Sequence, residues 1–144
     1  MDVIVVLDTS VIIKWYRQEE ILAKKALALR ESYLLGRIAV CQPSLAACEL
    51  ANVLRYKSEL STRAVREAMD SFFNMGFDFV SSTRNLIDRA VPLARENDVT
   101  VYDALFAAVA ESKNGYMITA DRKLHDRLSS FSFVHFLASI DRFL

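Results

Sequence analysis

The chain has 144 residues, of which 53% are hydrophobic and 25% are charged. This composition is that of a globular protein and excludes a disordered one, and its length predicts a single domain over residues 1–144. Its 18 basic and 18 acidic residues balance, so no overall field draws the chain to nucleic acid, and a polyanion would have to meet a local basic patch. No apolar run approaches the roughly 20 residues that a membrane span needs.

The N-terminus and the cysteines indicate a compartment. Asp2 and the absence of a basic leading segment argue against a signal peptide. Cys41 and Cys48 both lie in apolar surroundings, which predicts two buried thiols in a reducing compartment. We therefore expect a cytoplasmic protein with no membrane partner.

The first predicted strand covers residues 3–7, an unbroken and mostly β-branched run. Such a run is typical of a strand covered on both faces, as in a parallel sheet. The strand delivers Asp8 to its carboxyl end, where open α/β sheets bind their ligands. Thr9 and Ser10 offer capping hydroxyls for a short helix over residues 11–16.

A longer helix is predicted over residues 19–35, with Ile21 and Leu34 on its apolar face and Gly36 as its end. A second strand is predicted over residues 38–41. Gln42, Pro43 and Ser44 then predict a turn, with Ser44 as the N-cap of the next helix.

The helix predicted over residues 45–57 is apolar nearly all round. Within residues 45–54 only Glu49 and Asn52 are polar, and their spacing of three places them on one face. A carboxylate in such a helix must be desolvated, paired or metal-bound. The structural alternative is a buried ion pair with Arg55 or Lys57.

The remaining pattern alternates helices and strands. Ser61 is predicted to cap one helix, and either Thr83 or Asn85 to cap the next, which has Ile87 and Val91 facing inward. Thr100 and Asp103 have the form of a capping box for the helix that follows. This alternation predicts a three-layer α/β/α sandwich with a central, mostly parallel sheet of four to five short strands. The later strands are expected at 77–80, 116–119 and 133–136, and the later helices at 62–74, 85–96, 104–110, 121–128 and 139–144.

Asp8, Asp103 and Asp121 each stand where a strand ends or a helix begins. Helix capping can explain each of them separately. In a parallel sheet, however, these ends share one edge, so we expect the three acids and Glu49 to converge there. Crowded carboxylates repel one another unless cations share the site, and Mg²⁺ or Mn²⁺ prefers such oxygen ligands. Two such ions are a standard device for phosphodiester cleavage.

Other carboxylate chemistries fit the pattern less well. A lone acid pair would indicate glycoside hydrolysis, whereas four acids without a nearby catalytic His favour metal-assisted phosphoryl chemistry. A phosphatase with Asp8 as nucleophile expects a second Asp two residues later, where Ser10 stands, and a receiver domain expects a lysine that Lys123 is poorly placed to supply.

Four short motifs occur in order along the chain: Leu7-Asp8-Thr9-Ser10, Glu49 in Ala-Cys-Glu-Leu-Ala-Asn, Tyr102-Asp103-Ala104 and Ile118-Thr119-Ala120-Asp121. Together they resemble the motifs of PIN domains over essentially the whole chain, and most of all the small ribonuclease toxins of toxin–antitoxin pairs (the VapC type). The resemblance implies an Mg²⁺- or Mn²⁺-dependent endoribonuclease, with Asp8, Glu49, Asp103 and Asp121 as its acidic metal site and Thr119 lining it. It also implies an antitoxin over the active-site groove and a homodimer.

Further residues are assigned supporting roles. Thr9 and Asn52 are expected as polar neighbours of the acids, and Trp15, Tyr16, Leu54 and Tyr56 are candidates for the antitoxin surface, with core packing as the alternative. The second hypothesis for the whole chain is a non-catalytic RNA- or protein-binding module of the same fold. Candidates for binding RNA phosphates are Lys14, Arg17, Arg55, Lys57, Arg122 and Lys123.

Overall fold

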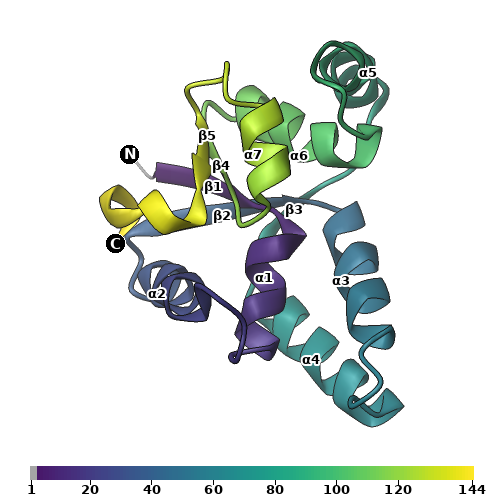
Figure 1. The fold of residues 1–144 in the computed structure, drawn as a ribbon, viewed down its shortest axis with the longest axis vertical. Helices are drawn as coiled ribbons and strands as arrows, with labels where there is room; N and C mark the ends of the chain where they lie inside the picture. Colours follow the sequence, from purple (N-terminus) through teal and green to yellow (C-terminus); the bar gives the residue numbers. More distant parts are fainter. Residues whose placement is uncertain (1–2) are drawn as a thin grey trace.

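A computed structural model describes residues 3–144 (Figure 1); Asp2, on which the signal-peptide expectation rests, lies outside them. Five strands form one sheet in the order β3-β2-β1-β4-β5, and every neighbouring pair is parallel. The predicted α/β architecture with a central parallel sheet is confirmed. The strands are β1 (Val3–Leu7), β2 (Ile38–Pro43), β3 (Asp78–Val80), β4 (Tyr116–Thr119) and β5 (Val134–Phe136).

Helices cover both faces of this sheet. In Figure 1, α5 and α6 lie on one side of it and α1 and α2 on the other, while α3 and α4 extend from its β3 end. The helices are α1 (Thr9–Tyr16), α2 (Ala23–Leu34), α3 (Leu45–Arg55), α4 (Thr62–Asn74), α5 (Arg84–Asn97), α6 (Val101–Ser112) and α7 (Arg122–Arg127), followed by the short 3₁₀ turns η1 (Leu137–Ser139) and η2 (Asp141–Phe143). None of the helices within residues 3–144 has the length and apolar character that a membrane crossing requires.

The strand order reverses beside β1. The chain builds outward from β1 through β2 to β3, and then returns so that β4 pairs with the other side of β1. Such a reversal opens a crevice beyond the carboxyl ends of the two central strands, which is where α/β sheets bind ligands. Asp8 follows β1 at this point, and Thr119 ends β4.

The core is formed around β1 and α6. Val5, Val6 and Leu7 are at most 1% exposed, as expected for a central parallel strand. The run from Ala104 to Ala110 on α6 is buried throughout. Small alanine side chains let this helix approach the sheet closely, and α5 covers its other side.

Two predicted helices differ from the observed ones. The helix expected from residue 19 begins only at Ala23, because Leu22 adopts a left-handed conformation with φ of 66°. Ile21 and Leu34, expected to face inward, are 83% and 59% exposed. On α5, Ile87 and Val91 are also exposed, because the face packed inward is the one bearing Ala90, Leu93 and Ala94.

The predicted turn at residues 42–44 is wrong for Gln42 and Pro43, whereas Ser44 is a turn residue that directly precedes α3. β2 continues through Gln42 and Pro43, and the hydroxyl of Ser44 donates to the Val80 carbonyl at 3.1 Å rather than capping α3. The expectation for the thiols is half right. Cys41 is buried, whereas Cys48 is exposed, because the buried stripe of α3 is formed by Ala46, Leu50 and Leu54.

Candidate functional site

Asp8 is the buried centre of the site. It is 6% exposed and stands directly after β1, with its backbone N–H donating to the Ile118 carbonyl of β4 at 2.9 Å. Its side chain does not cap α1. Instead, Oδ2 accepts hydrogen bonds from the hydroxyls of Ser10 at 2.6 Å and Thr119 at 3.0 Å. Two neutral hydroxyls therefore hold this carboxylate at the edge of the sheet.

Glu49 reaches the same place from α3. Its Oε1 accepts the hydroxyl of Thr9 at 2.9 Å, which ties α3 to the first turn of α1. Within residues 3–144 Glu49 forms no ion pair, so the alternative of a buried pair with Arg55 or Lys57 is not realised.

The two remaining acids begin helices. The backbone N–H of Asp103 donates to the Thr100 hydroxyl at 3.0 Å, as the capping-box pattern predicts. Asp121 caps α7 by accepting the Leu124 N–H at 3.2 Å, and its own N–H donates to the Thr119 hydroxyl at 3.0 Å. Thr119 therefore contacts both Asp8 and Asp121.

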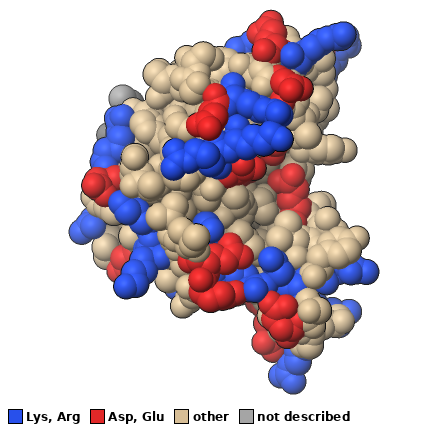
Figure 2. Space-filling model, viewed as in Figure 1, with Lys and Arg blue, Asp and Glu red and all other residues tan. Residues whose placement is uncertain are grey.

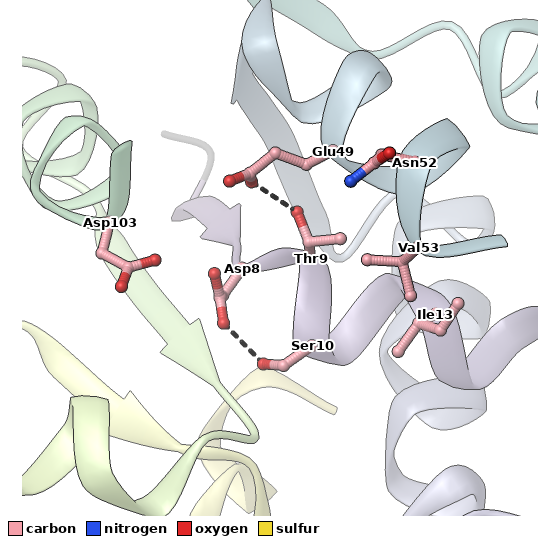
Figure 3. A pocket seen from close by; sticks show the side chains of 8 residues that line it. All are labelled: Asp8, Thr9, Ser10, Ile13, Glu49, Asn52, Val53 and Asp103. Atoms are coloured by element: carbon pink, nitrogen blue, oxygen red, sulfur yellow. Dashed lines mark hydrogen bonds between the residues drawn. The ribbon is translucent and has the colours of Figure 1, made fainter. Parts of the chain in front are cut away.

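These elements enclose a pocket of about 330 Å³, which we call the central pocket. In Figure 2 acidic side chains gather around a hollow bordered by α7, α1 and α3. Figure 3 shows the carboxyl groups of Asp8, Glu49 and Asp103 directed into the shared space. The complete lining is Asp8, Thr9, Ser10, Ile13, Glu49, Asn52, Val53 and Asp103. Asp121 lies outside this lining, in a neighbouring hollow that also includes Asp103.

The carboxyl groups influence one another. Burial raises the pKa of Asp8 above its ordinary value, the Ser10 and Thr119 hydrogen bonds oppose that rise, and the charge of Asp121 adds to it. Burial also raises the pKa of Glu49, against the Thr9 hydrogen bond, with further contributions from Asp8 and Asp103. The pKa of Asp103 rises from 3.8 to about 6, first through burial and then through the charge of Asp8. The site is therefore short of positive charge.

The donor chemistry fits a hard divalent cation. Carboxylate and hydroxyl oxygens are the ligands that Mg²⁺ and Mn²⁺ prefer. A cation would favour the charged carboxylates against the burial and the repulsion that raise these pKa values. Within residues 3–144, however, no three His, Cys, Asp or Glu side chains lie close enough together to hold a metal ion. Mg²⁺ commonly uses only one or two protein carboxylates and keeps several waters, so the arrangement is compatible with an ion held in that way.

The candidate phosphate-binding residues divide into two groups. Lys14 pairs with Glu20 at 3.2 Å, and Arg17 pairs with Glu59 at 2.7 Å and also with Glu19, so both charges are neutralised within the protein. The guanidinium of Arg55 lies over the Tyr56 ring and that of Arg122 over the Phe136 ring, at 4.3 and 4.0 Å. Lys57 is half-buried and Lys123 is exposed.

The candidates for an antitoxin surface are partly wrong. Trp15 is 3% exposed and donates its indole N–H to the Ala26 carbonyl at 2.8 Å, and Leu54 is fully buried. Both are core residues. Tyr16 is half-buried, and Tyr56 is 68% exposed. Of the four, only Tyr56 presents most of its side chain to solvent.

Gln42 has a structural role that was not predicted from the sequence. This side chain is fully buried, and its amide accepts the Leu7 N–H at 2.6 Å and donates to the Leu7 carbonyl at 2.7 Å. It thus acts as a backbone partner for the residue before Asp8, beyond the last paired position of β1 with β2 at Val5 and Val40. A polar residue directly after an apolar strand was the available signal. Ser10 was likewise assigned only a capping role.

Comparison with known proteins places this geometry in a family context. The family model described as "PIN domain" matches residues 5–129. No curated protein matches the chain.

Several solved structures share the fold. PAE2754 from Pyrobaculum aerophilum is 19% identical with a TM-score of 0.69, over 96% of this chain and 86% of that one. A toxin–antitoxin complex from Klebsiella pneumoniae is 15% identical with a TM-score of 0.66, over 90% of this chain and 94% of that one. Mycobacterium tuberculosis VapC20, described as a sarcin-ricin loop cleaving toxin, is 18% identical with a TM-score of 0.68, over 90% of this chain and 96% of that one. Likeness at this low identity establishes the fold.

Proposed function

The chain belongs to the PIN domain family, whose model spans residues 5–129 of its 144, and on this premise we propose that it is a divalent-metal-dependent endoribonuclease. The observation that carries the proposal is the central pocket. Three carboxyl groups from separate parts of the chain, Asp8, Glu49 and Asp103, line one cavity. Burial raises the pKa of each, and the charge of Asp8 adds to the rise at Glu49 and Asp103. Mutual repulsion of this kind is a cost that a bound cation would remove.

We propose that Asp8, with one or more of Glu49, Asp103 and Asp121, would hold Mg²⁺ or Mn²⁺. When bound, such an ion would lower the pKa of a water molecule and stabilise the charge that develops on the scissile phosphate. These four acids are the catalytic residues of the proposal. Three of them, Asp8, Asp103 and Asp121, stand at strand ends or helix starts near the point where the strand order reverses beside β1.

The chain's own hydroxyl groups orient these acids. Ser10 and Thr119 both donate to Oδ2 of Asp8, and the other carboxylate oxygen is directed into the pocket (Figure 3). Thr9 fixes one oxygen of Glu49. Asn52 also lines the pocket, and its amide offers both a donor and an acceptor to a water molecule or to RNA. The side chains are therefore positioned before any ligand arrives, which is the condition for efficient positioning of substrate.

RNA binding is proposed for the basic candidates that form no ion pair within residues 3–144, namely Arg55, Lys57, Arg122 and Lys123. Lys14 and Arg17 are left out because acidic neighbours already neutralise them. The chain has no net charge, so affinity for RNA would come from these local cations through counterion release.

We further propose that the chain is the toxin of a toxin–antitoxin pair, acting in the cytoplasm as a homodimer. The support is the fold shared with VapC20 and with a toxin–antitoxin complex. A further support is the exposed Tyr56, which directly follows α3, the helix that contributes Glu49, Asn52 and Val53 to the pocket. An antitoxin would cover this side of the central pocket.

The direct test is cleavage of cellular RNA by the purified chain with EDTA, Mg²⁺ or Mn²⁺, with the new RNA ends mapped by sequencing. Asp8→Asn should abolish metal-dependent cleavage while circular dichroism shows an intact fold. The matched control is Asp70→Asn, an exposed acid on α4 away from the pocket, which should cleave like the parent. Cleavage by Asp8→Asn at the parental rate would refute the assignment.

One observation favours the second candidate, a non-catalytic RNA- or protein-binding module. Within residues 3–144 no three metal-ligating side chains are gathered as they would be in a preformed metal centre. The melting temperature with and without Mn²⁺ separates the two candidates, because binding to the native state alone must raise it. No rise, together with no RNA cleavage, would favour the binding module.

A further inference from the structure

A second hollow adjoins the central pocket. This side pocket has a volume of about 390 Å³ and is lined by residues 98–100, Asp103, Asp121 and three residues of α7, Lys123, Leu124 and Arg127. Asp103 belongs to both pockets. The two therefore form neighbouring compartments on either side of one carboxylate, and each has the size of a small-molecule site.

The wall of the side pocket formed by α7 is basic. Lys123 and Arg127 are four residues apart and so face the same way, and the buried Leu124 anchors the helix between them. Figure 2 shows a band of Lys and Arg side chains over α7, next to the acidic hollow. The position of this band is consistent with a polyanion that passes over the acids.

Only one of these two cations is free. Arg127 donates to the Asp98 carbonyl and lies 3.7 Å from the Asp98 carboxylate. Lys123 is exposed, and within residues 3–144 it forms no ion pair and no side-chain hydrogen bond. Its ammonium group is therefore available to a ligand that enters the side pocket.

From this arrangement we propose that the side pocket is a subsite for the RNA nucleotide next to the scissile phosphate, and that Lys123 binds the phosphate of that nucleotide. The proposal rests on the proposed function, because the subsite is defined by the phosphate that the chain would cleave. A cation bound in the central pocket, or the loss of one carboxylate charge in Asp8→Asn, would reduce the repulsion between RNA and these acids. Because Asp103 lines both hollows, the side pocket adjoins the place where the RNA strand would put its scissile phosphate. Contacts to phosphates of this kind fix the register of the strand rather than read its sequence.

The test uses the Asp8→Asn chain, so that RNA stays intact, and a fluorescent single-stranded RNA of mixed sequence whose anisotropy is followed over a range of NaCl concentrations. Adding Lys123→Gln should reduce the slope of log K against log salt by about 0.7, the value for one contact with a single-stranded phosphate. The matched control is Lys24→Gln, an exposed lysine of α2 outside both pockets. Equal slopes for the Lys123 and Lys24 variants would overturn the proposal.

A second measurement locates the contact. In RNA that the active chain cleaves at a mapped bond, single phosphates are replaced by neutral methylphosphonates. Lys123→Gln should weaken binding of the unmodified RNA, and this loss of affinity should vanish only when the replaced phosphate lies next to the cleaved one. Weakening that persists at both neighbouring positions would overturn the subsite while leaving the nuclease intact. Failure of the active chain to cleave any RNA would instead overturn the proposed function and the subsite with it.

Discussion

The hydroxyl of Thr119 lies 3.0 Å from Oδ2 of Asp8, although the two residues are 111 positions apart. The same hydroxyl accepts the Asp121 N–H at 3.0 Å. One fully buried oxygen atom thus connects the end of β1, the end of β4 and the start of α7. The positions of two proposed metal-binding acids depend on it.

The first prediction concerns this hydroxyl. Thr119→Val keeps the shape of the side chain but removes a hydrogen bond that lowers the pKa of Asp8. We expect a loss of about 1–3 kcal/mol in the free energy of unfolding, since a buried charged group loses a partner, and a smaller Mn²⁺-induced rise in melting temperature. Thr119→Ser, which retains the hydroxyl, should behave like the parent in both measurements. Equal behaviour of the Val and Ser variants would contradict this role.

The second prediction concerns pH. Folding raises the pKa of Asp103 from 3.8 to about 6, so between these values the folded state binds more protons than the unfolded state. The metal-free protein should therefore lose the contribution of this group to stability as the pH rises from about 3.8 through about 6. Urea unfolding of the parent and of Asp103→Asn across this range isolates the effect, because other carboxyl groups titrate in both. The difference in free energy of unfolding between the parent and Asp103→Asn should change with pH in that interval and be constant above it.

Metal binding should show the opposite dependence. Protons compete with a cation for Asp103, so the Mn²⁺-induced rise in melting temperature should grow as the pH increases through about 6. A rise that is independent of pH between about 5 and 7 would indicate that Asp103 does not take part in metal binding.

The third prediction concerns Gln42, whose amide bonds both backbone groups of Leu7. Gln42→Met fills a similar volume but leaves a buried N–H and a buried carbonyl without partners. We expect a loss of several kcal/mol, about 1–3 for each group, measured by chemical denaturation. RNA cleavage by the fraction that remains folded should also fall, because Leu7 positions Asp8. Gln18→Met, at an exposed glutamine outside the sheet, is the control and should cost much less.

The fourth prediction concerns the approach of β4 to β1. A Cβ atom at Gly115 would lie 2.6 Å from the Ile4 carbonyl oxygen and 3.1 Å from its Cβ atom. Because the nearest atom belongs to backbone, it cannot swing aside, and Gly115→Ala should destabilise the protein by about 1–3 kcal/mol. Lys113→Ala, two residues earlier and exposed, provides the control. A Gly115→Ala protein as stable as this control would show that the strands can separate without cost.

Some features followed from local pattern alone. The β-branched run of β1, the caps at Ser61, Thr83 and Thr100 and the strand at residues 116–119 all appear where the sequence predicts them. Each depends on a few neighbouring residues. Errors arose where a residue's surroundings come from elsewhere. Apolar Ile21 and Ile87 face solvent, and Gln42 belongs to a strand because its amide bonds Leu7, 35 positions away.

The sequence by itself determined which acids stand at strand ends and helix starts, and hence that Asp8 and Asp103 would approach each other at one edge of a parallel sheet. Only the tertiary structure decided that Glu49 bonds Thr9 rather than a basic side chain, and that Asp121 lies in the side pocket. It also decided that Lys14 pairs with Glu20, whereas Lys123 has no ion-pair partner among residues 3–144. The physical reason is the distance along the chain over which each interaction acts. Strand and helix termini are fixed by local backbone preferences, whereas the partner of a charged side chain is set by how separate elements pack.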